Sequence, residues 1–139
     1  MWLVNQRTGD TIASEVEIAA TRASRRKGLL GRASLDPSAA LVLAPCFAVH
    51  SAFMRFAIDV MFLNEDGTVR RIVPLRPWRM AVSVGASAVV ELAEGCSRGV
   101  RAGDRVYLSD GSGVLSPLVS SFSGSSLRRT ASSPACSGS

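Results

Sequence analysis

The chain of 139 residues is poor in cysteine and histidine, and it has no long hydrophobic run. Its three cysteines, Cys46, Cys96 and Cys136, are an odd number and lie far apart, which fits reduced thiols better than a disulfide framework. No apolar run approaches the roughly 20 residues that a membrane-spanning helix needs, so we expect no transmembrane segment. No basic segment followed by an apolar stretch opens the chain. We therefore expect no secretory signal and a cytoplasmic location.

Motifs of several functional classes are also missing. The sequence contains no phosphate-binding GxxxxGK[ST] loop, no GxSxG nucleophile elbow and no HExxH zinc helix. Its basic residues are not interleaved with aromatic residues, and no RNA-binding motif is present, which argues against a nucleic-acid partner. The length and the 47% of hydrophobic residues predict one globular domain.

Composition divides this chain after Asp110. Residues 111–139 are rich in Ser and Gly and contain no acidic residue, so we expect a disordered tail after a folded domain over residues 1–110. Within the domain, short apolar or alternating runs such as TIASEVEIA, IDVMFL and AVVELA predict about seven strands. Residues 64–67, NEDG, predict a hairpin turn.

One helix is expected, near residues 21–31, where TRASRRKGLLGR offers Thr21 as the N-cap and Gly31 as the end. One short helix among so many strands predicts a mainly β fold, either a small barrel or a sandwich-like arrangement.

The segment CFAVHSAFMRFAIDV, from Cys46 to Val60, contains the only histidine of the chain. On an extended strand over residues 53–62, Met54 and Ile58 would lie on a core face and Arg55 and Asp59 on the other. A buried carboxylate must be hydrogen-bonded or paired. Asp59 is therefore expected to accept from backbone amides, to pair with an arginine, or to line a polar pocket.

Cys46 and His50 are the candidate catalytic and metal-ligating residues. A thiolate beside an imidazole could be a nucleophile with its base, and the same two groups could be half of a zinc site. With one histidine in the chain, a complete site would need Cys96 or a carboxylate such as Asp59 or Glu91. A packed thiol without reactivity is the alternative. Zinc is the only cofactor that the pattern suggests, and the sequence leaves open whether the protein is an enzyme.

Glu91 repeats the pattern of Asp59, because it is a carboxylate inside an apolar run. Four polar residues, His50, Arg55, Asp59 and Glu91, could converge on a pocket with apolar walls, the usual composition of a ligand site. The first hypothesis is thus a small β domain that binds a small ligand or a partner protein through this pocket. The alternative is that each acid lies on the solvent face of its strand.

The arginine-rich helix gives a further alternative. Arg22, Arg25 and Arg26 are spaced i, i+3 and i+4, so they share one helical face and could bind phosphate or a nucleic-acid backbone weakly. Such a run is more often a solvated face.

Four segments, in this order, resemble one known family: ATRASRRKGLLGR, LVLAPCFAVHSAFMRFAIDVMFLNEDGTV, VVELAEG and GVRAGDRV. The second contains the family's aromatic–Met–basic, turn, Ile and Asp pattern at residues 53–60, and one branch also has a Cys and a His where Cys46 and His50 stand. The sequence resembles the domain of unknown function 192 family of bacteria and archaea over residues 15–107. The resemblance implies a compact, mostly β domain with a short helix, and it implies no catalytic role for any residue.

Overall fold

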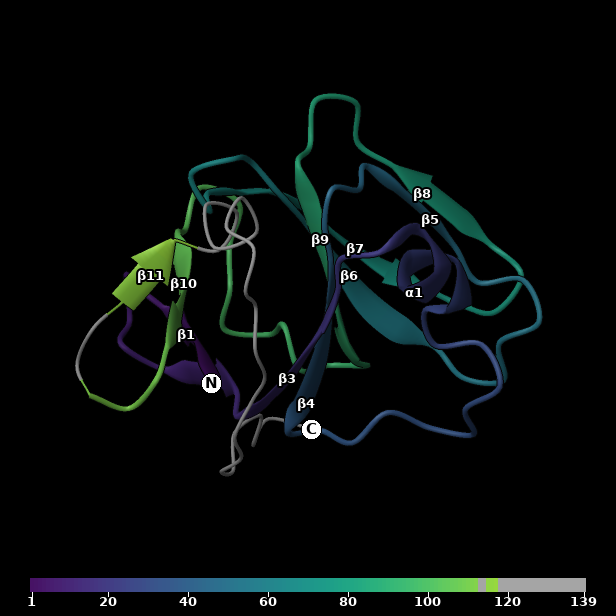
Figure 1. Cartoon of the computed structure of the whole chain (residues 1–139), viewed down its shortest axis with the longest axis horizontal. Coiled ribbons are helices and arrows are strands. Elements are labelled where there is room, and N and C mark those ends of the chain that lie inside the picture. The colour runs from purple at the N-terminus through teal and green to yellow at the C-terminus, as the bar shows by residue number, and fades with distance from the viewer. Residues whose placement is uncertain (113–114, 118–139) are drawn as a thin grey trace.

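The computed structural model describes residues 1–112 and 115–117, and most of their regular structure is β (Figure 1). One sheet has the strand order β11-β10-β1-β2, with every pair antiparallel. Its strands are β1 (Trp2–Asn5), β2 (Thr11–Ala13), β10 (Val106–Ser109) and β11 (Leu115–Pro117). The pairing of β1 with β10 joins the beginning of the domain to its end.

A five-stranded sheet, ordered β3-β4-β9-β6-β7, forms the centre of the molecule (Figure 1). Its strands are β3 (Glu15–Ala19), β4 (Ala39–Leu43), β6 (Ile58–Leu63), β7 (Val69–Leu75) and β9 (Ala88–Ala93). Only β3 and β4 pair in parallel, and the connection between them contains the helix α1 (Arg22–Lys27). A parallel pair needs such a crossover connection.

A separate antiparallel ribbon consists of β5 (Ala48–His50) and β8 (Met80–Val82). Figure 1 shows it near α1, on the side of the molecule away from β1, β10 and β11. Val49 and Ala81 lie opposite each other and are buried, whereas the next pair, His50 and Met80, is exposed. Because successive side chains of a strand alternate, the ribbon has a buried inner face and a solvent-facing outer face.

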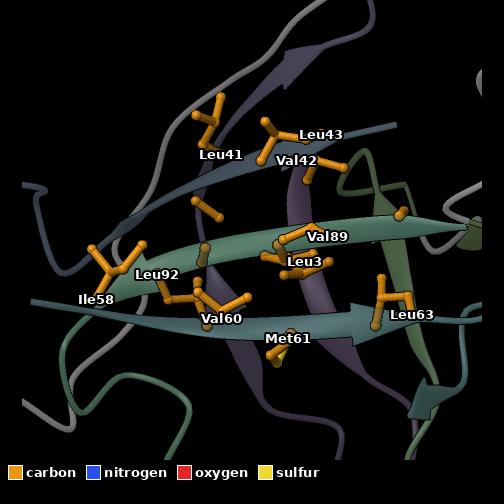
Figure 2. Close-up of a cluster of buried hydrophobic side chains, with 14 of the residues drawn as sticks. Leu3, Leu41, Val42, Leu43, Ile58, Val60, Met61, Leu63, Val89 and Leu92 are labelled. Atoms are coloured by element: carbon orange, nitrogen blue, oxygen red, sulfur yellow. The ribbon is translucent and has the colours of Figure 1, made fainter. Parts of the chain in front are cut away.

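The hydrophobic core covers both faces of the five-stranded sheet. All six residues of β6 and all six of β9 are buried, so neither strand presents a face to solvent. Figure 2 shows Val60, Val89 and Leu92 of these strands near Leu3 of β1, which is fully buried. Burying a side chain of this size contributes about 1.5–3 kcal/mol. Leu3 therefore helps to hold the two larger sheets together.

The predicted mainly β fold with one short helix is confirmed, and the barrel alternative is wrong. The described strands form three sheets, and none of these sheets closes on itself. Closure of a barrel depends on which edge strands pair, and the alternation of residues along each strand carries no information about that pairing.

The helix α1 begins as predicted and ends earlier. The Thr21 Oγ1 accepts a hydrogen bond from the Ser24 amide at 3.0 Å, within a capping box. Gly28, at φ 47°, is the C-cap, so the helix ends at Lys27 rather than near Gly31. No helix in the described part of the chain is long and apolar enough to cross a membrane.

The segment expected to be one long strand is broken before β6. The amide of Met54 donates to the carbonyl of Ser51 at 3.1 Å, and Phe53 adopts φ 66°, so the chain turns here. The assignment of Met54 and Arg55 to opposite faces of a strand is therefore wrong. In contrast, the hairpin turn at residues 64–67 joins β6 to β7 as predicted.

One strand lies within the stretch that composition assigns to a tail. Leu115–Pro117 forms β11 and pairs with β10, so regular structure continues beyond Asp110. Residues 113–114 and 118–139, including Cys136, lie outside the described residues. The disordered tail at those positions stays a prediction.

Candidate ligand-binding site

A cavity of about 330 Å³ lies between α1, the end of β4, β5 and β9. Leu29, Leu43 and Met54 contribute apolar walls, and Cys46 and His50 also line it. Cavities of this size suit small molecules when a few polar groups converge in them. We call it the Glu91 cavity, after the buried acid in its lining.

The charged side chains of α1 border this cavity. Arg22, Arg25, Arg26 and Lys27 line it together, and we call these four residues the basic rim. The Arg25 Nη1 donates to the carbonyl oxygens of Ala20 at 2.6 Å and Ala44 at 3.3 Å, which fixes its guanidinium against the fold. The other three side chains are exposed.

Glu91 is 4% exposed and lies on β9 between Leu41 of β4 and Val60 of β6. Its Oε2 is buried and accepts no hydrogen bond within the described residues. Burial raises the pKa of Glu91 from 4.5 to about 7, although the positive charge of Arg32 opposes this shift. Near neutral pH a large fraction of this carboxyl group is therefore protonated and uncharged.

Cys46 does not have the environment of a reactive thiol. Its Sγ donates to the carbonyl oxygen of Ala48 at 3.2 Å. Burial raises the pKa of this thiol; the Ala48 hydrogen bond and Arg25 lower it, while the nearby Glu91 raises it further. A raised pKa leaves little thiolate at neutral pH, and the thiolate is the nucleophilic form.

His50 lines the same cavity, and its side chain is bonded to backbone. The amide of Ala52 donates to its Nδ1 at 3.3 Å. In the neutral imidazole the ring proton then lies on Nε2. Since Cys46 donates to a carbonyl and His50 accepts from an amide, the candidate nucleophile–base pair is not formed by these contacts.

The described residues form no metal centre. Across residues 1–112 and 115–117, no group of three or more His, Cys, Asp or Glu side chains is placed to hold a metal ion. Cys46, His50 and Glu91 line one cavity without forming such a group. A zinc site that uses Cys46 and His50 stays a prediction, and it would need ligands that this region does not bring to them.

Asp59 and Glu91 do not share a pocket. Val60 lies directly opposite Glu91, and Asp59 lies opposite Leu92. Residues opposite each other in an antiparallel pair share a face, and neighbours along a strand alternate. The two acids therefore point to opposite faces of the sheet. Arg55 is exposed in the turn before β6 and does not line the Glu91 cavity.

Asp59 has a structural role instead. Its Oδ2 accepts from the amides of Gly95 and Ser97, both at 3.1 Å, and from the Ser97 hydroxyl at 2.5 Å. These bonds hold the turn after β9. The interpretation in which Asp59 accepts from nearby backbone amides is confirmed.

Sequence reasoning placed the arginine helix and the acid pocket in two separate hypotheses, and the structure joins parts of both. The parallel crossover from β3 to β4 carries α1 to the cavity that Glu91 lines. The helical spacing of the arginines predicts that they share one face of α1. The sequence does not predict that β3 pairs with β4, which brings α1 to the cavity, because alternation along a strand does not identify the neighbouring strand.

The chain is similar to an uncharacterized family and to UPF0127 proteins of archaea. The model of DUF192, described as an uncharacterized ACR, matches residues 3–108. A UPF0127 protein of Pyrococcus abyssi is 32% identical over 94 residues, which are 63% of this chain and 78% of that protein. A UPF0127 protein of Pyrococcus furiosus is 42% identical over 62 residues, which are 42% of this chain and 53% of that protein.

Two solved structures share the fold. A protein of unknown function from Novosphingobium aromaticivorans has a TM-score of 0.62 at 22% identity, covering 76% of this chain and 91% of that one. A candidate transcription regulator from Sinorhizobium meliloti has a TM-score of 0.67 at 25% identity, covering 76% and 88%. With the family model matched across nearly all of the described residues, the chain belongs to the DUF192 family.

Proposed function

We propose that this domain binds a small organic anion that also carries a hydroxyl or amino group, in the Glu91 cavity. The observation that carries the proposal is the Glu91 Oε2, which is buried without a hydrogen-bond partner in the described structure, beside the basic rim. Leaving a buried polar atom unpartnered costs about 1–3 kcal/mol. A ligand that donates to Oε2 would remove this cost on binding.

The basic rim supplies the recognition of negative charge. Arginine binds carboxylate and phosphate groups through paired hydrogen bonds. Arg25 is already fixed by its two carbonyl contacts, so little side-chain entropy is lost when it binds. Protonation of Glu91 matters here, because a neutral carboxyl group does not repel the anion and can itself donate a hydrogen bond.

The environment of Cys46 favours a binding function over catalysis in which this thiol is the nucleophile. The thiol donates to a carbonyl oxygen and its pKa is raised, so the proposal treats Cys46 as part of the cavity wall. We expect Cys46→Ala to bind the ligand as the wild type does. Loss of ligand binding in this variant, with folding intact, would favour the hypothesis of a Cys/His enzyme.

The proposal is tested by ligand screening of the purified protein. Thermal shift and titration calorimetry would compare hydroxycarboxylates and sugar phosphates with the uncharged alcohols and sugars of the same size. We expect only the anions to raise the melting temperature. Native mass spectrometry of protein purified from cells would reveal a bound organic anion by its mass. A panel in which no anion binds contradicts the proposal.

Glu91→Met separates binding from folding. The substitution removes the unpartnered oxygen, so we expect the fold to gain about 1–3 kcal/mol while the anion response is lost. Arg26→Gln should weaken the same anion roughly tenfold, since a charge-assisted hydrogen bond contributes about 1.5–3 kcal/mol. The control is Arg98→Gln, because Arg98 is an exposed arginine that does not line this cavity.

A further inference from the structure

Six large apolar side chains are exposed around the β5–β8 ribbon: Phe47, Phe53, Trp78, Met80, Val82 and Val84. We call these six residues the apolar patch. They are all of the exposed large hydrophobic residues in the described part of the chain, and every one belongs to the ribbon or to the loops that flank it. Four of them, Phe53, Trp78, Met80 and Val84, are 58–80% exposed. Exposed apolar side chains that gather on one ribbon and its flanking loops indicate a site of association.

Two aromatic residues of the patch are held in unfavourable backbone conformations. Phe53 at φ 66° and Trp78 at φ 64° are the only non-glycine residues with positive φ among those described. Their rings meet edge to face with centroids 4.6 Å apart. The hydroxyl of Ser51 accepts from the Arg79 amide at 2.8 Å, and the Trp78 amide donates to the Ser51 carbonyl at 3.0 Å. The fold thus presents both rings to solvent at a cost, instead of burying them.

Positive charge surrounds this patch. Arg71 donates to the carbonyl of Val82 at 2.8 Å, and Arg70 donates to the carbonyl of Val84 at 3.0 Å. Arg79 lies between Trp78 and Met80 in the chain. These arginines belong to none of the three ion pairs found among the described residues. Residues 37–58 and 67–90, which build the ribbon and its surroundings, contain no acidic residue at all.

We propose that the apolar patch docks the domain on an anionic phospholipid surface, with Trp78, Phe53 and Met80 inserted at the level of the headgroups and the arginines on lipid phosphates. Aromatic rings prefer this interfacial depth, and each basic residue near an anionic bilayer adds attraction. The chain would bind peripherally, because insertion of a few side chains needs no membrane-spanning segment.

The chemistry of the patch favours a lipid surface over the other candidate partners. Protein interfaces combine an apolar centre with hydrogen-bonding groups and charges of matched sign, whereas this region contains no acid. Single-stranded nucleic acid stacks on open aromatic faces. Here Phe53 and Trp78 meet edge to face instead of lying side by side as stacking platforms, Phe47 is the one further aromatic residue of the patch, and Met80, Val82 and Val84 offer no stacking surface.

The test uses Trp78 as the reporter. The chain has two tryptophans, so Trp2→Phe leaves Trp78 as the only one. We expect its fluorescence to shift to shorter wavelength, and to be quenched by brominated acyl chains, on mixing with phosphatidylcholine vesicles in which a third of the lipid is phosphatidylserine. Vesicles of phosphatidylcholine alone should bind more weakly, and added salt should weaken binding to the anionic ones.

Variants assign the binding to the patch. Met80→Ser with Val84→Ser should weaken vesicle binding roughly tenfold, since two exposed apolar side chains no longer enter the interface. Both residues are highly exposed, so the fold is expected to persist, and the melting temperature checks it. Arg79→Gln should weaken binding by about fivefold. Met80→Leu, which keeps the apolar side chain, and Arg98→Gln, away from the patch, should bind as the wild type does.

Three outcomes would overturn the proposal. The first is absence of a Trp78 shift with anionic vesicles at low salt. The second is a concentration-dependent dimer in ultracentrifugation that the Met80 and Val84 substitutions abolish while vesicles are ignored. The third is binding of a single-stranded oligonucleotide, but not of vesicles, by the same surface. Glu91→Gln should leave vesicle binding unchanged, so failure of anion binding in the cavity and failure of lipid docking are distinguishable.

Discussion

At the scale of single residues, Glu91 makes folding stability depend on pH near neutrality. Its pKa rises from 4.5 in the unfolded chain to about 7 in the folded protein. The folded state therefore binds more protons between these pH values, and the free energy of unfolding falls as pH rises through the window. At 1.36 kcal/mol per pKa unit, the total loss is about 3 kcal/mol.

Glu91→Gln should remove this dependence. We expect the variant to match the wild type near pH 5 and to exceed its free energy of unfolding by up to about 3 kcal/mol at pH 8. Urea unfolding at both pH values measures the difference between the two proteins. An identical difference at pH 5 and pH 8 would show that Glu91 titrates at its ordinary pKa.

Sequence identified the two buried acids but not the direction in which each points. Asp59 and Glu91 both stand out as carboxylates in apolar runs, and both are buried. Their faces follow from the register of β6 against β9. In a half-exposed strand, the alternation of apolar and polar residues reveals the face. Here both faces of the sheet are covered, so that signal is missing, and a pocket joining Asp59 to Glu91 could not be excluded beforehand.

At the scale of elements, the strands with a clear apolar or alternating pattern could be predicted, whereas β5 and β8 could not. The segments that became β6, β7 and β9 combine apolar and β-branched residues over six or seven positions, which is a sufficient signal. β5 and β8 have three residues each and form a pair only with one another. Their existence depends on contacts distant in sequence, such as those of Ser51 with Arg76 and Arg79, and not on local propensity.

The turn between β6 and β7 provides a test of how closely elements pack. Gly67 adopts φ +89°, and a Cβ at this position would lie 2.7 Å from the carbonyl oxygen of Val106 in β10. Gly9 has a similar φ of +77°, with nothing within 4 Å of its Cβ position. Gly9→Ala should cost about 1–2 kcal/mol from backbone strain alone. Gly67→Ala should cost a further 1–3 kcal/mol or so, because the turn must move away from β10.

Thermal or urea unfolding of the two alanine variants measures this difference directly. Because both glycines carry the same conformational strain, the excess cost of Gly67→Ala reports the close approach to Val106. Equal losses in the two variants would mean that the β6–β7 turn has room beside β10.

At the scale of the whole molecule, the charges are unevenly distributed. Asp104 lies in the loop before β10 and joins segments from opposite ends of the domain. It accepts from the Asn5 side chain at 2.9 Å, from the Arg7 Nε at 2.6 Å and from the Arg101 amide at 2.9 Å. By contrast, the region of β5 and β8 contains no acid, so the charges of its arginines are not neutralised there, although Arg70 and Arg71 donate to backbone carbonyls. The Arg7–Asp104 and Arg105–Asp66 ion pairs lie beside β1 and β10, whereas the arginines of the β5–β8 region form no ion pair among the described residues, a distribution that the order of residues along the chain does not reveal.

Strongly acidic pH should therefore weaken the contacts that Asp104 makes with Asn5, Arg7 and Arg101, and so lower the free energy of unfolding. The hydrogen bond from Arg7, together with those from Arg101 and Asn5, lowers the pKa of Asp104 below its ordinary value of 3.8. A group whose pKa is lowered by folding stabilises the protein above its unfolded pKa, and this contribution disappears as pH falls below that value. Asp104→Asn should cost about 1.5–3 kcal/mol at pH 7, as expected for hydrogen bonds to a charged group, and somewhat less at pH 3, where the unfolded carboxyl group is largely protonated while the folded one is still charged. Asp36 is the matched control, since its pKa is also lowered but only by Ser38 within its own loop, so Asp36→Asn should change stability much less than Asp104→Asn does. Urea unfolding at pH 7 and pH 3 compares the variants, and an equal cost for the two at pH 7 would mean that Asp104 does not hold the ends of the domain together.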